Sequence, residues 1–249
     1  MLVETHNALR LGDNLVHMNF MRRVVEQSDV DFIHYVGDMC AHAELIPFTE
    51  GLDERIKILP IAQRTNTSVE SWRGPYWYSH PKRLDFAEFH IDWFEHLSKQ
   101  LGIQSPIKTK YDLLMDYPGL KNIHTPTVDV VVINSQPLSG QFGAYSESAY
   151  KALILYLLDA GYSVLTIKPT GLCPDATGHN VAWIGAVSAK AKVIVGTSTG
   201  PSWPCLNVEN RNALHVLCLD TENVILTDRG RTARTVKQAS EILKEEGIL

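Results

Sequence analysis

The hydrophobic pattern of the first 61 residues predicts one helix and two strands. Apolar side chains recur at three- and four-residue steps over residues 14–27, which is typical of an amphipathic helix. Asp13 and Asn14 stand at its start, and we expect one of them to cap it. The apolar runs 31–37 and 54–61 predict two strands.

A long aperiodic stretch separates these elements from a second helix. Residues 63–83 mix Gly, Pro, aromatic and basic side chains without a period, and we expect a loop there. Apolar side chains then fall on one helical face over 85–101. Asp85 is placed to begin this helix and Gly102 to end it.

The second half of the chain alternates strand and helix patterns more regularly. Apolar runs predict strands at 128–134, 163–169, 192–196 and 214–219, and helical patterns lie at 146–160, 179–189 and 234–246. Such alternation predicts a doubly wound parallel sheet, in which ligands bind at the carboxyl ends of the strands. The candidate ligand-binding residues therefore lie at 135–143, 168–172 and 197–203.

The two α/β halves are joined by a stretch typical of a linker between domains. Residues 117–129 combine two prolines and a glycine with polar side chains. We therefore predict two domains, 1–125 and 126–249.

Composition and charge exclude several classes of protein. The chain has 249 residues, 45% of them hydrophobic, and 23 Lys and Arg against 28 Asp and Glu give a net charge of −5. This balance argues against a nucleic-acid binder that works by neutralising phosphates. The sequence has no apolar run of about 18 residues and no secretory signal, so we expect a cytoplasmic protein without a transmembrane segment. Peripheral contact with a membrane stays open.

The cysteines and histidines do not form a pattern typical of metal sites. The four cysteines, Cys40, Cys173, Cys205 and Cys218, include no CxxC pair, and no HExxH motif occurs. We therefore expect reduced thiols, no metal and no cofactor.

The sharpest local motif follows the predicted strand 192–196. Free backbone N–H groups of the turn, with the hydroxyl groups of Thr197, Ser198 and Thr199, predict a pocket for a phosphate group. The alternative is a tight strand-to-helix turn with a structural cap.

The same residues also fit the GxSxG motif of α/β hydrolases, with Ser198 as nucleophile. The rest of the expected triad is poorly represented, because His215 is the only later histidine and precedes Asp220. Glu209 is the only acidic residue between Ser198 and His215 in the sequence. A hydrolase is therefore the weakest of the alternatives.

A second candidate is Asp13, which follows Gly12 at the start of the first helix. A carboxylate there could act as a general base toward a hydroxyl group, although the helix dipole favours its ionised form and lowers its basicity. The structural alternative is a helix cap.

The stretch 63–83 combines aromatic and basic side chains, among them Arg73, Trp77 and Lys82. This composition suits stacking on sugar rings and binding of anionic groups, but equally a contact with another protein or a surface loop packed on itself. Lys168, directly after a strand, is a candidate for contact with a phosphate or a base.

With these residues in view, the sequence resembles the ADP-heptose:lipopolysaccharide heptosyltransferases of glycosyltransferase family 9. The resemblance rests on four segments: LRLGDNLVHMNFMRRV (9–24), DFAEFHIDWFEHLSKQLGI (85–103), YKALILYLLDAGYSVLTI (150–167) and VIVGTSTGPSW (193–203). It implies an α/β fold with two Rossmann-like domains and a cleft between them, called GT-B, here in a compact version.

The resemblance also implies a function. It implies a metal-independent, inverting hexosyl- or heptosyltransferase that moves a sugar from a nucleotide-diphosphate sugar to a glycan, lipopolysaccharide-type or other hydroxyl acceptor. Asp13 matches the family's catalytic base, and Thr199 and Gly200 match its diphosphate-binding turn. The residues assigned to the donor are Ser139, Gln141, Lys168, Thr197, Ser198, Thr199 and Gly200. Those assigned to the acceptor are Gly12, Asn14, Arg73, Trp77 and Lys82.

Three positions depart from the family pattern. Ser198 stands where the family has an acidic residue, and Trp203 stands where it has a histidine. Residues 139–145 lack the expected lysine or arginine. These departures open the alternative of a non-catalytic nucleotide- or glycan-binding relative, or a partner subunit.

Overall fold

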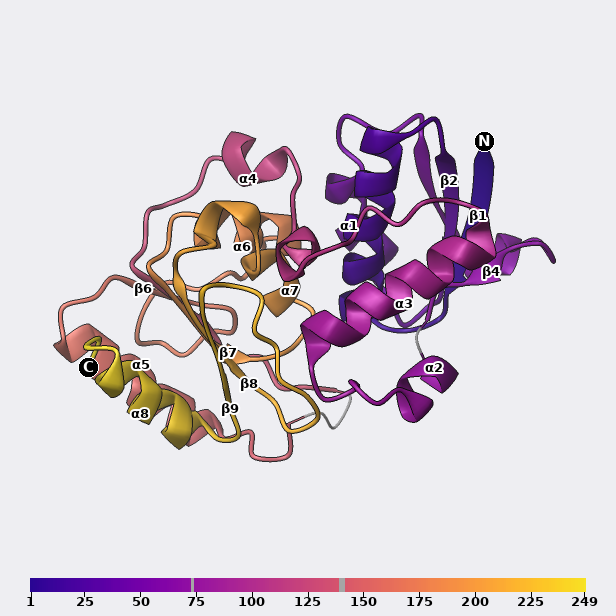
Figure 1. Ribbon diagram of the computed structural model, residues 1–249. Coiled ribbons are helices and arrows are strands. Elements are labelled where there is room, and N and C mark those ends of the chain that lie inside the picture. Colours follow the sequence, from indigo (N-terminus) through magenta and orange to yellow (C-terminus); the bar gives the residue numbers. More distant parts are fainter. Residues whose placement is uncertain (73, 139–141) are drawn as a thin grey trace.

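The computed structural model describes residues 1–72, 74–138 and 142–249 and contains two parallel β-sheets with helices packed against them (Figure 1). The first sheet has the order β3-β2-β1-β4, with β1 Leu2–Asn7, β2 Asp31–Val36, β3 Ile56–Pro60 and β4 Val69–Glu70. The second has the order β6-β5-β7-β8-β9, with β5 Val130–Ile133, β6 Val164–Thr166, β7 Val193–Thr197, β8 Leu214–Cys218 and β9 Arg229–Ala233. The predicted α/β class is confirmed.

Most of the predicted helices are present with the expected ends. The helices are α1 Leu11–Gln27, α2 Gly74–Ser79, α3 Phe86–Leu101, α4 Gly119–Asn122, α5 Glu147–Asp159, α6 Val181–Ser188, α7 Ser202–Cys205 and α8 Val236–Glu245. Asp85 caps α3 by accepting a 2.9 Å hydrogen bond from the Glu88 N–H, and Gly102 ends it at φ 68°.

The start of α1 differs from the prediction. The helix begins at Leu11, with Arg10 as its N-cap residue, so Asp13 lies in its first turn instead of capping it. The Asn14 amide donates to the carbonyl oxygens of Leu9 and Arg10, each at 3.1 Å, so it also does not cap the helix. The sequence could not show this, because a polar residue in a first turn and one at a cap have similar neighbours.

The loop predicted at 63–83 is partly wrong. It contains the short strand β4, in which Val69 pairs with Thr5, and the helix α2. Strands β1 and β9 are also missing from the prediction. All three strands are short or rich in polar residues, and they are fixed by pairing with neighbouring strands rather than by their own hydrophobic pattern.

A continuous hydrophobic core joins the two sheets. Helices α1 and α3 cover one face of the first sheet, and their Phe20 and Phe94 rings stack 4.6 Å apart. The same core includes apolar residues of α6 and of the segment around α7, which lie on the facing side of the second sheet. A separate core on the far side of that sheet is covered by α5 and α8, which lie side by side (Figure 1). The second sheet thus has helices on both of its faces.

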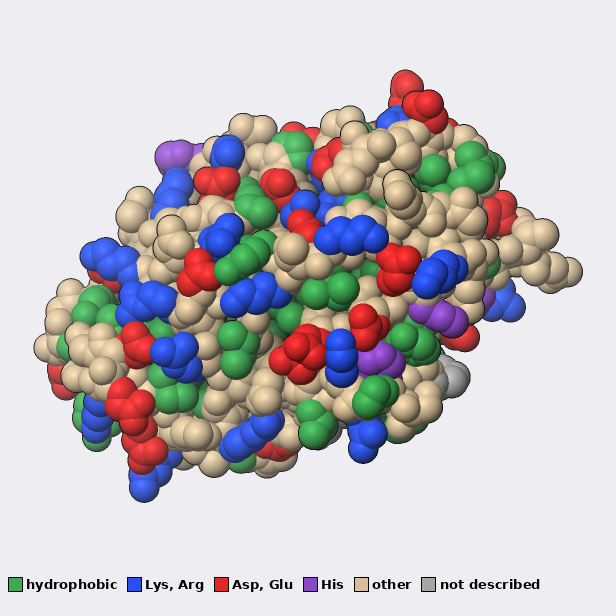
Figure 2. Space-filling view, in the orientation of Figure 1, with side chains coloured by type: hydrophobic (Ala, Val, Ile, Leu, Met, Phe, Trp, Pro, Cys, Tyr) green, Lys and Arg blue, Asp and Glu red, His purple; other side chains and the backbone are tan. Residues whose placement is uncertain are grey.

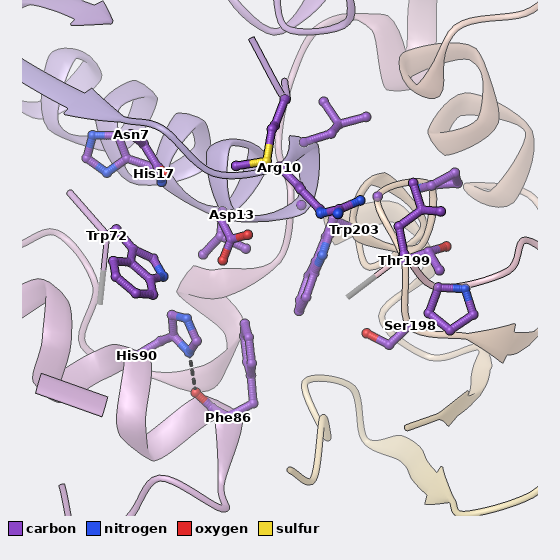
Figure 3. A pocket seen from close by; sticks show the side chains of 18 of the residues that line it. Asn7, Arg10, Asp13, His17, Trp72, Phe86, His90, Ser198, Thr199 and Trp203 are labelled. Atoms are coloured by element: carbon purple, nitrogen blue, oxygen red, sulfur yellow. Dashed lines mark hydrogen bonds between the residues drawn. The ribbon is translucent and has the colours of Figure 1, made fainter. Parts of the chain in front are cut away.

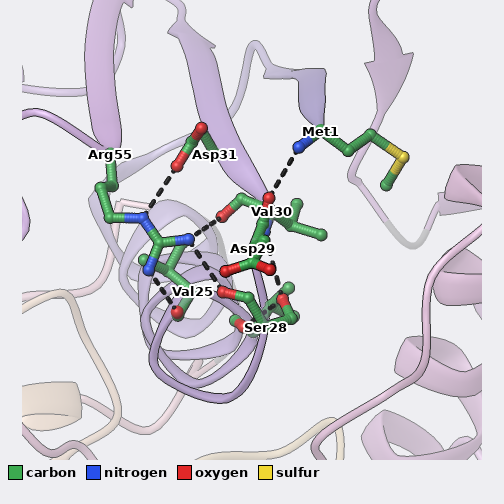
Figure 4. A network of polar contacts seen from close by, with 8 residues as sticks. Met1, Val25, Ser28, Asp29, Val30, Asp31 and Arg55 are labelled. Carbon is green, nitrogen blue, oxygen red and sulfur yellow. Dashed lines mark hydrogen bonds and ion pairs between the residues drawn. The ribbon is translucent and has the colours of Figure 1, made fainter.

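The C-terminal end of α1 is held by Arg55 from the segment before β3 (Figure 4). Its guanidinium donates to the carbonyl oxygens of Val25 and Ser28 at 2.8 Å each, and to Asp31 at 2.8 Å. A cation at this position satisfies carbonyl groups that the helix leaves unpaired. Arg55 therefore fixes α1, whose opposite end reaches the cavity described below.

The predicted boundary near residue 125 lies between the two sheets and remains a prediction. The preceding segment already contacts the second half, because the Tyr117 hydroxyl donates to the Ala182 carbonyl oxygen at 2.7 Å. On the face shown in Figure 2, acidic and basic side chains are interspersed over both halves. Within the described ranges, no helix combines the length and apolar character needed to cross a bilayer.

Candidate functional site

A cavity of about 350 Å³ lies between the two halves of the protein (Figure 3). From the first half it is lined by segments after β1, β2 and β4 and by one face of α3. From the second half it is lined by the segments after β5, β6, β7 and β8. Its size is within the usual range for a small-molecule site.

The cavity lies at the point where each sheet reverses its strand order. In the first sheet this point lies between β1 and β4, and in the second between β5 and β7. Ligands of open parallel sheets bind at such points, beyond the carboxyl ends of the strands. The two sheets thus direct both of their expected ligand sites into one cavity.

Gly196 allows the two central strands of the second sheet to meet at this point. It pairs with Ile133 and has φ 141°, a conformation that favours glycine. A Cβ atom here would lie 2.3 Å from the Ile133 carbonyl oxygen. Glycine is therefore required directly before the turn that lines the cavity.

The wall from the second half consists of loops tied together by hydrogen bonds. The Ser135 and Thr199 hydroxyl groups are 2.7 Å apart and connect the ends of β5 and β7. Asn134 accepts a 2.8 Å hydrogen bond from the Lys168 N–H and donates to the Lys168 carbonyl oxygen at 3.0 Å. The backbone that carries Lys168 is thereby fixed at the edge of the cavity.

The turn after β7 offers hydroxyl groups more than backbone donors. The Ser198 N–H donates to the Cys218 carbonyl oxygen at 3.1 Å, and the Thr199 N–H donates to the Ser202 hydroxyl at 3.2 Å. These two amides, which the sequence predicted to be available for a phosphate, are engaged within the protein. Ser198, Thr199 and Gly200 nevertheless line the cavity.

The opposite wall is built on the first turn of α1. Arg10, Gly12 and Asp13 all line the cavity, and Figure 3 shows the Asp13 carboxylate pointing into it. A Cβ atom on Gly12 would lie 2.6 Å from Trp203 Nε1. Trp203 also stacks on Phe86, with ring centroids 4.8 Å apart. The indole of Trp203 therefore joins α1, α3 and α7 at the floor of the cavity.

A second cavity of about 340 Å³ adjoins the first and shares Asp13 with it. Trp72, Trp77 and Tyr78 give it an aromatic lining, and Glu222 from the second half also lines both cavities. The aromatic faces and carboxylates together suit a molecule with both apolar and hydroxyl-bearing surfaces.

Two buried histidines lie behind Asp13. His17, one helical turn farther along α1, is 2% exposed and lines the larger cavity, and His34 on β2 is fully buried. Burial lowers the pKa of His17 well below its usual value and that of His34 to about 3. A nearby histidine lowers each of these pKa values further, because it disfavours a second positive charge. Both imidazoles are therefore neutral at physiological pH.

The predicted site residues fall into three groups. Gly12, Asp13, Lys168, Ser198, Thr199 and Gly200 line the larger cavity and Trp77 the smaller one. Asn14, Thr197 and Lys82 line neither cavity and have partners elsewhere in the protein. Asn14 is hydrogen-bonded to His34, the buried Thr197 hydroxyl is 2.7 Å from the Tyr150 hydroxyl, and Lys82 forms surface ion pairs with Glu88 and Asp92. Arg73, Ser139 and Gln141 lie outside the described residues.

Sequence reasoning missed several residues that line the cavities. Glu222 follows the carboxyl end of β8, and this position in an α/β chain could have marked it. Arg10, His17, Phe86 and His90 also line the larger cavity. Arg10 directly precedes α1, and the other three lie on α1 and α3; all four were hidden among apolar positions that predict only a core.

The residues of the hydrolase alternative do not come together. His215 is buried on β8, where its Nε2 lies 3.3 Å from the Asn210 carbonyl oxygen, and it lines neither cavity. Glu209 forms a 3.0 Å ion pair with Lys121. Ser198 therefore has neither of its candidate triad partners beside it.

Comparison with known proteins identifies the fold. No family model matches the sequence, and no curated protein matches it either. Among solved structures, Escherichia coli heptosyltransferase WaaC with ADP-2-deoxy-2-fluoro heptose is similar over 99% of this chain and 100% of that chain, with a TM-score of 0.65 and 12% identity. The E. coli ADP-heptose lipopolysaccharide heptosyltransferase II matches over 99% and 100%, with a TM-score of 0.60 and 13% identity.

A glycosyltransferase of family 9 from Veillonella parvula is also similar, over 99% of this chain and 89% of that chain, with a TM-score of 0.57 and 11% identity. The resemblance to heptosyltransferases that the sequence indicates is therefore confirmed for the fold, over nearly the whole chain.

Proposed function

We propose that this protein is a glycosyltransferase of GT-B architecture that transfers a sugar from a nucleotide-diphosphate sugar to a hydroxyl group. The observation that carries the proposal is the cavity at the switch points of both sheets, with Asp13 on one wall and Thr199 on the other. The fold shared with heptosyltransferases supports it.

The reaction follows from the chemistry of the two walls. The Asp13 carboxylate accepts the proton of the acceptor hydroxyl group while the acceptor oxygen forms a bond to the anomeric carbon. The bond from that carbon to the diphosphate oxygen breaks, and its electron pair leaves with the nucleoside diphosphate. Attack and departure on opposite faces invert the configuration of the sugar.

The groups of the second half stabilise the leaving diphosphate. The Lys168 ammonium group and the hydroxyl groups of Ser198 and Thr199 supply positive charge and hydrogen-bond donors without a metal ion. Arg10 adds a cation from the other wall, and Figure 3 shows it between Asp13 and Thr199. Because similar proteins were solved with ADP and with an ADP-heptose analogue, we propose an ADP-sugar as donor.

In this proposal the acceptor occupies the smaller cavity and extends past Asp13 along the wall of the larger cavity that α1 forms. Trp72, Trp77 and Tyr78 provide faces for a sugar ring, and Asp13 lies where the two cavities meet. A glycan acceptor held there would present a hydroxyl group to Asp13.

Calorimetric titration with ADP, UDP, GDP and CDP, with and without EDTA, tests the donor site. We expect ADP to bind with a dissociation constant on the order of micromolar that EDTA does not change. Thr199→Trp should abolish binding by filling the turn, and Thr177→Trp, at an exposed position outside both cavities, should not.

The titration also separates the alternatives. Failure of all four nucleotides to bind would contradict the donor site. Binding of ADP without release of ADP from ADP-heptose, in the presence of glycan acceptors, would favour a non-catalytic nucleotide-binding protein.

A further inference from the structure

A chain of buried hydrogen bonds runs from α1 through the first sheet and back to the cavity wall. Asn14 Oδ1 lies 2.9 Å from His34 Nε2, and His34 Nδ1 lies 2.9 Å from the Thr5 hydroxyl. The same hydroxyl lies 3.2 Å from His17 Nε2. All four side chains are at most 2% exposed. The direction of each hydrogen bond is therefore fixed within the protein.

The direction is set first at Asn14. Its Nδ2 lies 3.1 Å from the carbonyl oxygens of both Leu9 and Arg10, which only accept hydrogen bonds. Asn14 Oδ1 must therefore face His34 as an acceptor, so His34 Nε2 carries the proton. Because the low pKa of His34 keeps its ring neutral, its Nδ1 is unprotonated.

The direction then passes through Thr5. The Thr5 hydroxyl donates its single proton to His34 Nδ1 at 2.9 Å, since the thioether of Met21 at 3.9 Å is a much weaker acceptor. The Thr5 oxygen is left to accept from His17, so His17 Nε2 carries the proton of that ring. His17 is also neutral, and its Nδ1 is therefore an unprotonated acceptor.

This Nδ1 atom is buried and has no hydrogen-bond partner among the residues that the structure describes. His17 lines the larger cavity one helical turn beyond Asp13, on the same face of α1. A buried acceptor without a partner is destabilising, and such groups in native proteins are few. The arrangement therefore points to a donor supplied by a molecule in the cavity.

We propose that His17 Nδ1 accepts a hydrogen bond from a hydroxyl group of the carbohydrate acceptor and so positions that acceptor beside Asp13. The proposal rests on the proposed function. His17 is a positioning residue, and Asp13 alone takes the proton of the attacking hydroxyl group. A carboxylate or fully ionised phosphate group at the same place would face His17 with lone pairs on both sides, so this atom favours a hydroxyl group over such an anion.

Nitrogen NMR of the protein labelled with ¹⁵N-histidine tests the tautomer directly. We expect His17 to show a protonated Nε2 and an unprotonated Nδ1 at neutral pH. The reverse tautomer would overturn the proposal, because a protonated Nδ1 cannot accept a hydrogen bond. This measurement uses the unmodified protein and does not depend on activity.

Two matched probes test the ligand. Methyl α-D-mannopyranoside carries hydroxyl donors, and its per-O-methylated derivative carries none. We expect the first to shift the His17 Nδ1 resonance saturably and the second to leave it unchanged. A resonance that neither compound moves, or that both move alike, would contradict the proposal.

Two substitutions distinguish a role of His17 in positioning the acceptor from a purely structural role. His17→Gln places a donor near Nε2 and keeps the hydrogen bond to Thr5 but removes the acceptor at Nδ1, and we expect the affinity for the mannoside to fall about tenfold. His17→Asn places an amide oxygen near Nδ1 and should retain most of that affinity. Equal losses in the two variants would indicate a structural role only and would overturn the proposal.

Titration with ADP keeps this result distinct from the proposed function. We expect both variants to bind ADP as the unmodified protein does, because His17 lies on the wall opposite Thr199. If the unmodified protein does not bind ADP but the mannoside still shifts the His17 Nδ1 resonance, the proposed transferase is refuted and the proposed carbohydrate site stands.

Discussion

The two walls of the cavity are built on different principles. The wall from the first half places Asp13 and His17 on one face of a helix whose far end Arg55 holds, above a buried polar network. The wall from the second half is a set of turns that uses two of its own amides internally and presents hydroxyl groups and Lys168. Substitution of Asp13 on the first wall should therefore affect turnover, and substitutions on the second wall should affect nucleotide affinity.

The largest effect is expected on the first wall, at Asp13. Asp13→Asn keeps the shape of the side chain and removes the proton acceptor, so we expect kcat to fall about 10²- to 10⁴-fold while the ADP dissociation constant is unchanged. Release of ADP from ADP-heptose and calorimetry measure the two quantities. An unchanged rate would exclude Asp13 as the base and remove the contrast between the walls.

The next effect is on the strand that supports the second wall. Gly196→Ala should lower the free energy of unfolding by about 3 kcal/mol, because the new methyl group meets the Ile133 carbonyl oxygen at a strained φ. Gly161→Ala is the control, since Gly161 also has a positive φ of 85° but has nothing within 4 Å of the new atom. Chemical denaturation should show a clearly smaller loss for the control; equal losses would show that φ alone is responsible.

The buried histidines should make the free energy of unfolding depend on pH. The first half contributes more to this dependence, because it holds His17 and His34 while the second half holds His215. The pKa of His34 is lowered to about 3 and that of His215 to about 4, so the unfolded chain binds protons below pH 6.5 that the folded chain does not. Stability is therefore fully present above pH 6.5 and falls with decreasing pH, by about 1.4 kcal/mol per unit for each such histidine.

Denaturation between pH 5 and 7 measures this slope. His34→Gln should reduce the slope by the contribution of one histidine, whatever its effect on stability at pH 7. A slope unchanged by the substitution would contradict the buried, neutral state of His34.

The smallest effect distinguishes two lysines. Lys168→Met should weaken ADP binding about fivefold, because an exposed cation at a phosphate site contributes modestly. Lys82→Met should leave ADP binding unchanged, since Lys82 lies in surface ion pairs away from both cavities. Calorimetry at low ionic strength tests the pair, and equal losses would show only a general effect of net charge.

The sequence predicts the second half better than the first, for a physical reason. Buried parallel strands such as β5 and β7 are continuous apolar runs, and their order along the chain with α5 and α6 leaves few arrangements. Strand β4 has two residues and exists because β1 offers a free edge to it. No local pattern encodes that pairing.

The candidate site shows the same limit. Thr199 could be predicted because it follows a buried apolar strand, where ligands bind. Asp13 could be predicted because it follows a glycine at the start of a predicted helix and matches the catalytic base of the family that the sequence resembles. His17 could not, because a histidine within the stripe of Leu15, Met18 and Met21 looks like a core residue. Its role depends on Thr5 and His34, which only the pairing of β1 with β2 brings together.

The core shared by the two sheets has a consequence for how the protein is made. Phe86 and Gly12 are covered by Trp203, which leaves the ribosome about 100 residues after α3 ends. At usual rates of synthesis the first half would wait roughly 5–20 s with this apolar surface open to solvent. During that interval the nascent chain can bind chaperones or aggregate. We expect a truncated first half, expressed alone, to bind chaperones or aggregate for the same reason.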